Sequence, residues 1–158
     1  MKKIILGLAA VTFFIACSTN SITGRKQLAL FGEETLQQQA TTEYQSFLSQ
    51  NKVLNVNSSK DAEMVRRVGS RIANAITQYY TQKGMASELN GYKWEFNLVD
   101  SKEVNAWCMP GGKVVVYSGL LPITQNEAAL AVVMGHEITH AIAHHGNQGV
   151  HVVVGRSF

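Results

Sequence analysis

The sequence predicts an α+β fold, with a small sheet over a central helix and two N-terminal helices beside it. Three observations support this fold class. Apolar residues recur at helical spacing through residues 33–51 and 59–83, and they alternate with polar residues over 92–99. A short β-branched run follows at 113–117, and residues 124–145 form a strongly apolar helical segment.

The first two helices are defined by their apolar stripes. The stripe of the first comprises Leu36, Ala40, Tyr44 and Phe47-Leu48. The stripe of the second comprises Val65, Val68, Ile72, Ile76 and Tyr79, and Gly84 is a suitable stop. Each stripe is one face of an amphipathic helix.

Two strands are expected next. Tyr92, Trp94, Phe96 and Leu98 alternate with polar residues, which is typical of a half-buried strand. A loop containing Pro110-Gly111-Gly112 leads to the second strand, at 113–117.

The third helix begins at a predicted capping box, Thr124 with Glu127 three residues later, and runs to about His145. Because this segment is so apolar, we expect it to be buried on most of its circumference. Histidine and glutamate side chains inside such a helix need partners, since unpaired buried charge is costly.

The N-terminus is predicted to be a lipoprotein signal peptide over residues 1–16. Lys2 and Lys3 precede an apolar run of 12 residues, which spans roughly 18 Å and is too short for the ~30 Å core of a bilayer. Phe14-Ile15-Ala16-Cys17 is similar to a bacterial lipobox, so Cys17 is the expected site of lipidation. Residues 17–32 would be the lipid-anchored tether. The protein would be anchored in the cell envelope facing the periplasm, and Ser18 favours the outer over the inner membrane.

Net charge and cysteine content limit which binding partners and cross-links are expected. Removing Lys2 and Lys3 from the 14 basic residues leaves 12 against 11 acidic ones, which predicts no nucleic-acid partner. Cys108 has no second cysteine once Cys17 is lipidated, which excludes a disulfide framework. We expect Cys108 to be a small buried residue.

The residues that carry chemistry are His136, Glu137 and His140, in the order His-Glu-Ile-Thr-His. Histidines four apart lie on one helix face, so both imidazoles can reach one Zn²⁺ ion. The metal would lower the pKa of its water, and Glu137 would take the proton as that water attacks a peptide carbonyl. His144 lies about 12 Å beyond His136 along a straight helix, too far to share the metal, and His145 is expected to be solvated.

A longer set of motifs resembles a known family. It comprises Thr23-Gly24-Arg25-Lys26-Gln27-Leu28, Asn105-Ala106-Trp107-Cys108-Met109-Pro110-Gly111-Gly112, residues 113–121, Asn126-Glu127-Ala128-Ala129 and Gly135-His136-Glu137-Ile138-Thr139-His140. Together these are similar to the HtpX/CAAX-prenyl-protease-like zinc metallopeptidases, and especially to their bacterial envelope lipoproteins and mitochondrial quality-control relatives. The resemblance covers residues 17 to about 148.

The resemblance implies a gluzincin fold, with one zinc ion per chain and polypeptide substrates. It also implies that the strand Lys113–Tyr117 is a sheet edge, on which Val114, Val115, Val116 and Tyr117 pair with an extended substrate. A plain sheet strand is the alternative for these residues. Asn105 and Pro110-Gly111-Gly112 would either shape the approach to that edge or serve as turn residues. Glu127 matches a recurrent family glutamate, although capping is sufficient to explain it.

Family members take a third zinc ligand from a glutamate on a later helix. Here the 18 residues from Ala141 to Phe158 contain no Asp, Glu or Cys, and Gly146 stands where an alternative third histidine would be. His151 remains a possible substitute. We therefore expect residues 33–158 to be a metallopeptidase domain that is incomplete at its C-terminus and lacks the third ligand.

The function expected from the sequence is zinc-dependent endopeptidase cleavage of unfolded or damaged envelope proteins. Two alternatives stay open: an inactive fragment or non-catalytic lipoprotein that acts as a binding module, and a fragment whose metal site is completed by a second copy.

Overall fold

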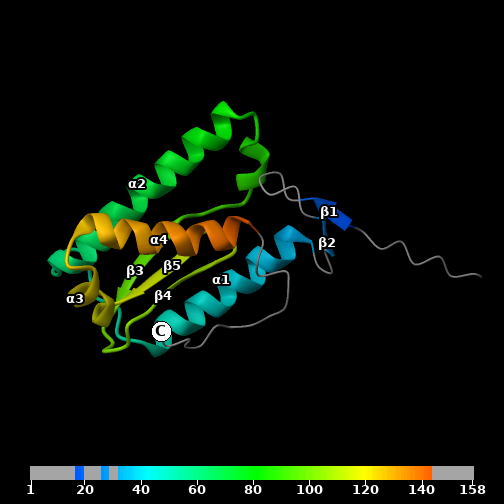
Figure 1. The fold of residues 1–158 in the computed structure, drawn as a ribbon. Helices are drawn as coiled ribbons and strands as arrows, with labels where there is room; N and C mark the ends of the chain where they lie inside the picture. The colour runs from blue at the N-terminus through cyan, green and yellow to red at the C-terminus, as the bar shows by residue number, and fades with distance from the viewer. Residues whose placement is uncertain (1–16, 20–25, 29–31, 144–158) are drawn as a thin grey trace, which may run out of the picture.

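The computed structural model describes residues 17–19, 26–28 and 32–143 (Figure 1). The predicted signal peptide, together with His144, His145 and His151, lies outside these residues. The elements along the chain are β1 (Cys17–Thr19), β2 (Lys26–Leu28), α1 (Glu33–Gln50), α2 (Lys60–Gln82), β3 (Glu95–Val99), β4 (Ala106–Met109), β5 (Lys113–Tyr117), α3 (Leu121–Thr124) and α4 (Glu127–Ile142). Short 3₁₀ turns occupy Ala86–Leu89 and Ser118–Leu120.

The two long N-terminal helices form where their apolar stripes predict, although Tyr79 of the second stripe is exposed. Tyr44 of α1 and Val65 of α2 are fully buried. Ser59 caps α2 by accepting a hydrogen bond from the Ala62 amide at 3.2 Å. Gly84 follows the helix with a φ of +69°, as predicted for a stop residue. Within the segment predicted to be a tether, β1 pairs with β2 antiparallel.

The main sheet has the strand order β3-β5-β4. β5 runs parallel to β3 and antiparallel to β4, so Val114 lies between Phe96 and Cys108. The sequence prediction that β5 is the edge strand is therefore wrong: Val114, Val115, Val116 and Tyr117 lie on the central strand. The physical reason is the turn at 110–112, where Gly111 and Gly112 adopt φ values of +79° and +81° and fold β4 back along β5.

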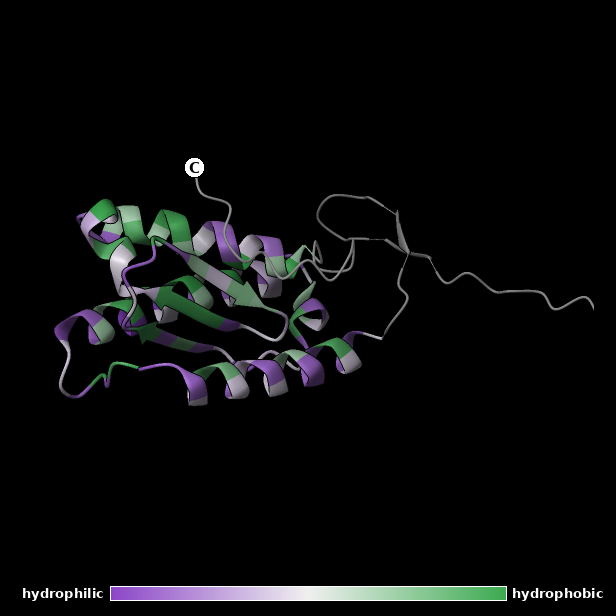
Figure 2. Ribbon diagram, turned by 90° about the horizontal axis from the view of Figure 1, so that it is seen from below, coloured by the Kyte–Doolittle hydropathy of each residue, from purple (hydrophilic) through white to green (hydrophobic). Residues whose placement is uncertain are grey.

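The sheet lies between two helical layers (Figures 1 and 2). α2 and α4 cover one face, and α1 covers the other. Alternation along β5 sends Val114 and Val116 into the core beneath α2 and α4, while Val115 packs with Tyr44 of α1. All three valines are fully buried. In Figure 2 the strands are predominantly hydrophobic, as expected for a sheet covered on both faces.

The start of α4 differs from the prediction. Thr124 ends the separate helix α3, and its hydroxyl donates to the Leu121 carbonyl at 3.2 Å. Gln125 then adopts a left-handed φ of 60°, and Asn126 caps α4 by accepting from the Ala129 amide at 2.9 Å. The predicted capping box is therefore wrong, because the chain reverses direction at Gln125 before α4 begins.

One face of α4 is open, contrary to the expectation that most of its circumference would be buried. Leu130, Met134 and Ile138 are fully buried against the sheet and α2. The opposite face is exposed at every fourth residue, and its members are Ala128, Val132, His136 and His140. In the described residues, then, the two histidines lie on a surface.

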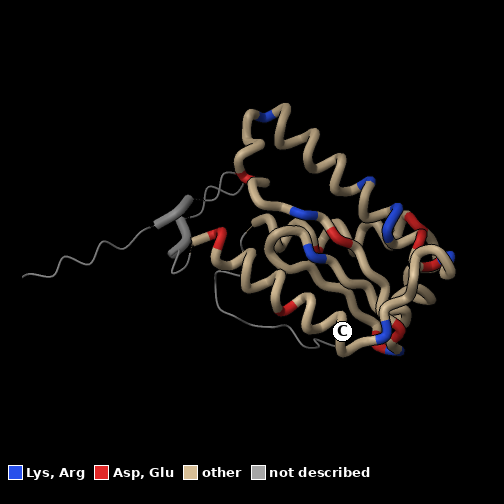
Figure 3. The backbone as a smooth tube through the Cα atoms, turned by 180° about the vertical axis from the view of Figure 1, so that it is seen from behind, with Lys and Arg blue, Asp and Glu red and all other residues tan. Residues whose placement is uncertain are grey.

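No helix in the described part of the chain is both long and apolar enough to cross a bilayer. Figure 3 shows acidic and basic residues interspersed over the described backbone, with no large region of one sign.

Candidate metal centre

The two motif histidines converge on one point. The Nε2 atoms of His136 and His140 lie 2.9 Å apart. Their ring centroids are 4.3 Å apart, with the planes nearly perpendicular at 88°. Residues four apart on a helix are stacked one turn above the other, and here both nitrogens are directed to the same side of α4.

This arrangement fits two of the four positions around a zinc ion. Two imidazole nitrogens at ~2.1 Å from a tetrahedral zinc would be separated by roughly 3.4 Å, so only a small opening of the pair is needed. Residues 32–143 place no third His, Cys, Asp or Glu with these two in a metal-binding group. The geometry therefore supports part of a metal centre.

Glu137 is the carboxylate of the site, and it is half-buried on the flank of α4. Burial raises the pKa of its carboxyl group above the ordinary value, and the nearby His136 partly offsets this increase. A raised pKa makes the carboxylate a better proton acceptor near neutral pH. Glu137 is thus next to the metal ligands and suited to act as a general base.

Cys108 of β4 lies on the side of the sheet that faces α4. It is a free thiol packed against the main core, and its Sγ donates to the Met109 carbonyl at 3.5 Å. Burial raises the pKa of this thiol, and the charge of Glu137 raises it further. The prediction of a small buried residue holds only in part, because Cys108 packs against the core but is partly exposed.

β4 is also the strand edge beside α4. The Tyr117 amide donates to the Asn105 carbonyl at 3.0 Å, so the main-chain groups of Asn105, Trp107 and Met109 face β5. Those of Ala106 and Cys108 therefore face away from the sheet. The edge that the sequence analysis placed on residues 113–117 lies on residues 106–109 instead.

A salt bridge joins the start of α4 to α2. The Arg67 guanidinium donates to both carboxylate oxygens of Glu127, at 2.8 Å each, and to Glu63 at 3.2 Å. Glu127 therefore binds Arg67 instead of closing a capping box. Sequence reasoning missed this contact because 60 residues separate its partners.

β4 was missed for a different reason. Its four residues carry no alternating pattern of apolar and polar side chains, so the sequence does not predict a strand there. The signal that could have revealed it is the Pro110-Gly111-Gly112 turn between two short apolar runs, which is typical of a hairpin.

Comparison with known proteins identifies the family. The model of Peptidase family M48 matches residues 59–157, more than half of the chain. The chain belongs to this family. The match extends past residue 148, where we expected the resemblance to end.

Individual relatives agree with this assignment. The chain is 30% identical to the mitochondrial metalloendopeptidase OMA1 of Bos taurus over 157 residues, which cover 96% of this chain and 29% of that protein. It is 45% identical to OMA1 of Arabidopsis thaliana over 64 residues, covering 40% of this chain and 13% of the relative. It is 40% identical to the beta-barrel assembly-enhancing protease of Escherichia coli over 74 residues, covering 44% of this chain and 15% of the relative. The chain thus spans less than a third of the length of these relatives.

Proposed function

We propose that this protein is a zinc metalloendopeptidase whose active site is built on α4. The observation that carries the proposal is the convergence of His136 and His140, 2.9 Å apart, with the half-buried Glu137 between them in sequence. Family membership supports the same reaction class, because the relatives above are named as metalloendopeptidases and as a protease.

Each residue has a distinct role in this proposal. His136 and His140 would hold zinc, with a third ligand from outside residues 32–143. When bound, the metal would supply Lewis-acid polarisation of water and of the scissile carbonyl. Glu137 would accept a proton from the attacking water and later deliver it to the leaving amine.

The substrate would be an extended, unfolded polypeptide. The outward main-chain groups of Ala106 and Cys108 offer hydrogen bonds that are independent of side-chain sequence. Most of the backbone of a folded protein is already paired within that protein, whereas an unfolded one can present extended, unpaired segments to this edge. The chain's resemblance to envelope lipoproteins supports quality control in the cell envelope as the setting, with Cys17 as the lipid anchor.

The test uses an unfolded, reduced and alkylated casein as substrate for the zinc-loaded chain. Glu137→Gln should lower the cleavage rate by about 10²–10⁴-fold, the usual contribution of a general base, while zinc content is unchanged. Glu34→Gln, an exposed carboxylate on α1, is the matched control and should cleave at the parent rate. Equal rates for the parent and Glu137→Gln would reject the assignment. Binding of casein without cleavage by any variant would favour the binding-module alternative.

A further inference from the structure

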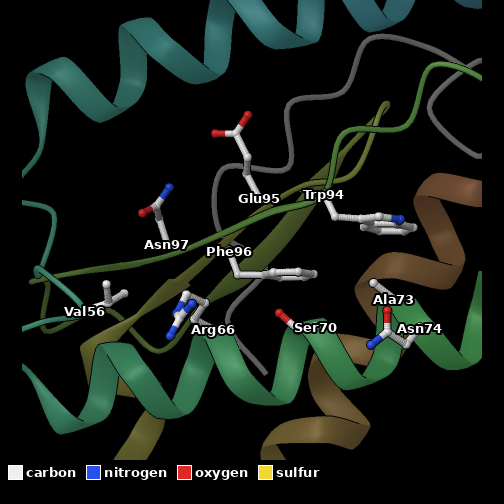
Figure 4. A pocket seen from close by; sticks show the side chains of 9 residues that line it. All are labelled: Val56, Arg66, Ser70, Ala73, Asn74, Trp94, Glu95, Phe96 and Asn97. Carbon is white, nitrogen blue, oxygen red and sulfur yellow. The ribbon is translucent and has the colours of Figure 1, made fainter.

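A groove runs along the free edge of β3, on the far side of the sheet from β4. Its volume is about 500 Å³, and α2 forms its wall. Figure 4 shows Arg66, Ser70 and Asn74 on α2, with Trp94 and Phe96 reaching toward the helix from the strand. Glu95 and Asn97 point to the other side of β3.

The helix wall of this groove is a polar stripe. Arg66, Ser70 and Asn74 are spaced by four, so they share one face of α2. All three are exposed, and within residues 32–143 none of them has a side-chain hydrogen bond or ion pair. The stripe therefore offers a guanidinium, a hydroxyl and an amide that are free to bind another molecule.

The strand side of the groove offers main-chain groups. The Glu95 amide donates to the Gly112 carbonyl at 3.0 Å, which directs the main chain of Glu95 and Asn97 toward β5 in the parallel register. The amide and carbonyl of Phe96 consequently face the groove. Leu98 is the next residue whose main-chain groups face away from β5. Its carbonyl is already paired, because it accepts a hydrogen bond from the Leu54 amide at 2.9 Å.

The segment at Val53 and Leu54 thus pairs with the end of β3 like the start of a fourth strand, but it does not continue along β3. Val53 pairs antiparallel with Val99, and the chain then turns away at Asn55, whose side chain accepts from the Asn57 amide at 2.8 Å. None of the described residues pairs with the edge beside Phe96, so another extended chain could continue the sheet there.

The groove beside β3 carries a net positive charge from Arg66. Glu95 is compensated by the buried Lys113, whose amine donates to its carboxylate. Arg66 has no such partner among the described residues, so the groove carries one uncompensated positive charge. An acidic side chain is the complement to that charge.

We propose that this groove binds an extended peptide segment that carries a carboxylate, by adding it as a strand to the free edge of β3. The segment's main chain would pair with the amide and carbonyl of Phe96, and its acidic side chain would bind Arg66. Because β3 and β4 are opposite edges of the sheet, this site is separate from the proposed metal centre. It goes beyond the proposed function, and it can be tested without any cleavage.

The experiment uses the full chain with Glu137→Gln, to prevent cleavage, and Trp107→Phe, so that Trp94 is the fluorescent reporter. The probe is an acetylated hexapeptide of alternating threonine and valine with one central aspartate. Arg66→Glu should weaken its binding at least tenfold. Arg71→Glu removes another exposed arginine of α2, outside the groove, and should change the affinity by less than twofold.

Two further probes test the strand pairing. In a strand, alternate residues face the protein, so N-methylation of one alternate set of amides should abolish binding and methylation of the other set should not. Replacing the aspartate by asparagine should also weaken binding, but by less than Arg66→Glu, which adds repulsion between two carboxylates. Equal weakening by Arg66→Glu and Arg71→Glu, parent-like binding of both methylated peptides, or no binding at millimolar peptide would each overturn the proposal.

Discussion

The chemistry of α4 depends on two intervals along one helix. Four residues separate His136 from His140, which brings their Nε2 atoms to 2.9 Å, and Glu137 follows the first histidine on the buried flank. These intervals are local, so the sequence alone predicted the constellation. The burial of Glu137, which raises the pKa of its carboxyl group, depends on the packing of α4 against the sheet and required the structure.

Cys108 should make stability fall at alkaline pH. Its thiol pKa is raised in the folded protein, whereas an unfolded cysteine has a pKa of about 8.5. The folded state therefore holds a proton that the unfolded state releases, so this contribution is complete below pH 8.5 and is lost as the pH rises above it. Urea unfolding at pH 7.5 and 9.5 should show a steeper loss for the parent than for Cys108→Ala, by at most about 1.4 kcal/mol per pH unit. Equal slopes would contradict a buried, protonated thiol.

Asn126 should contribute to stability as the cap of α4. Its side chain accepts from the Ala129 amide at 2.9 Å, so Asn126→Ala should lower the free energy of unfolding by about 0.5–2 kcal/mol. Chemical denaturation measures this difference. Asn126→Asp retains an acceptor at the helix start and serves as the control. If Thr124 were the cap of α4 instead, Asn126→Ala would leave the free energy of unfolding unchanged.

For several helices and strands the local pattern predicted the extent but not the neighbours, although β3 begins at Glu95 and not at the predicted Tyr92. The limits of β5 agree with the predicted run 113–117, and α1 and α2 agree within about a residue at each end. The place of β5 in the centre of the sheet was not predictable in this way. A strand's neighbours depend on pairing between distant segments, and a run of valines is compatible with either position.

The contact between α2 and β3 should be intolerant of added volume. A Cβ on Gly69 would lie 2.3 Å from the Phe96 ring, so Gly69→Ala should destabilise the fold by about 1–3 kcal/mol. Gly135 is the matched helical glycine, and a Cβ there would meet no atom within 4 Å. Gly135→Ala should therefore stabilise the protein by up to about 1 kcal/mol. Thermal or urea unfolding of both variants tests this contrast, and a similar response of the two would show that α2 and β3 are not so close.

The whole molecule is organised around a sheet with two different edges. β4 runs beside α4, whose exposed face carries the two histidines, and β3 runs beside the polar stripe of α2 (Figures 1 and 4). The amphipathic stripes predicted that the helices pack against other elements, but not that α1 covers one face of the sheet and α2 and α4 the other. The sequence did not predict the two sheet edges or the exposed face of α4. These features arise only when the three strands and three helices are assembled.

The zinc content of the purified protein shows whether His136 and His140 bind a metal ion together. The full chain would be dialysed against micromolar zinc, passed through a desalting column and analysed for metal per chain. We predict one zinc per chain, reduced to background by His136→Ala or His140→Ala and unchanged by Glu34→Gln. A parent chain with no more zinc than the double variant His136→Ala/His140→Ala would show that these histidines do not bind zinc.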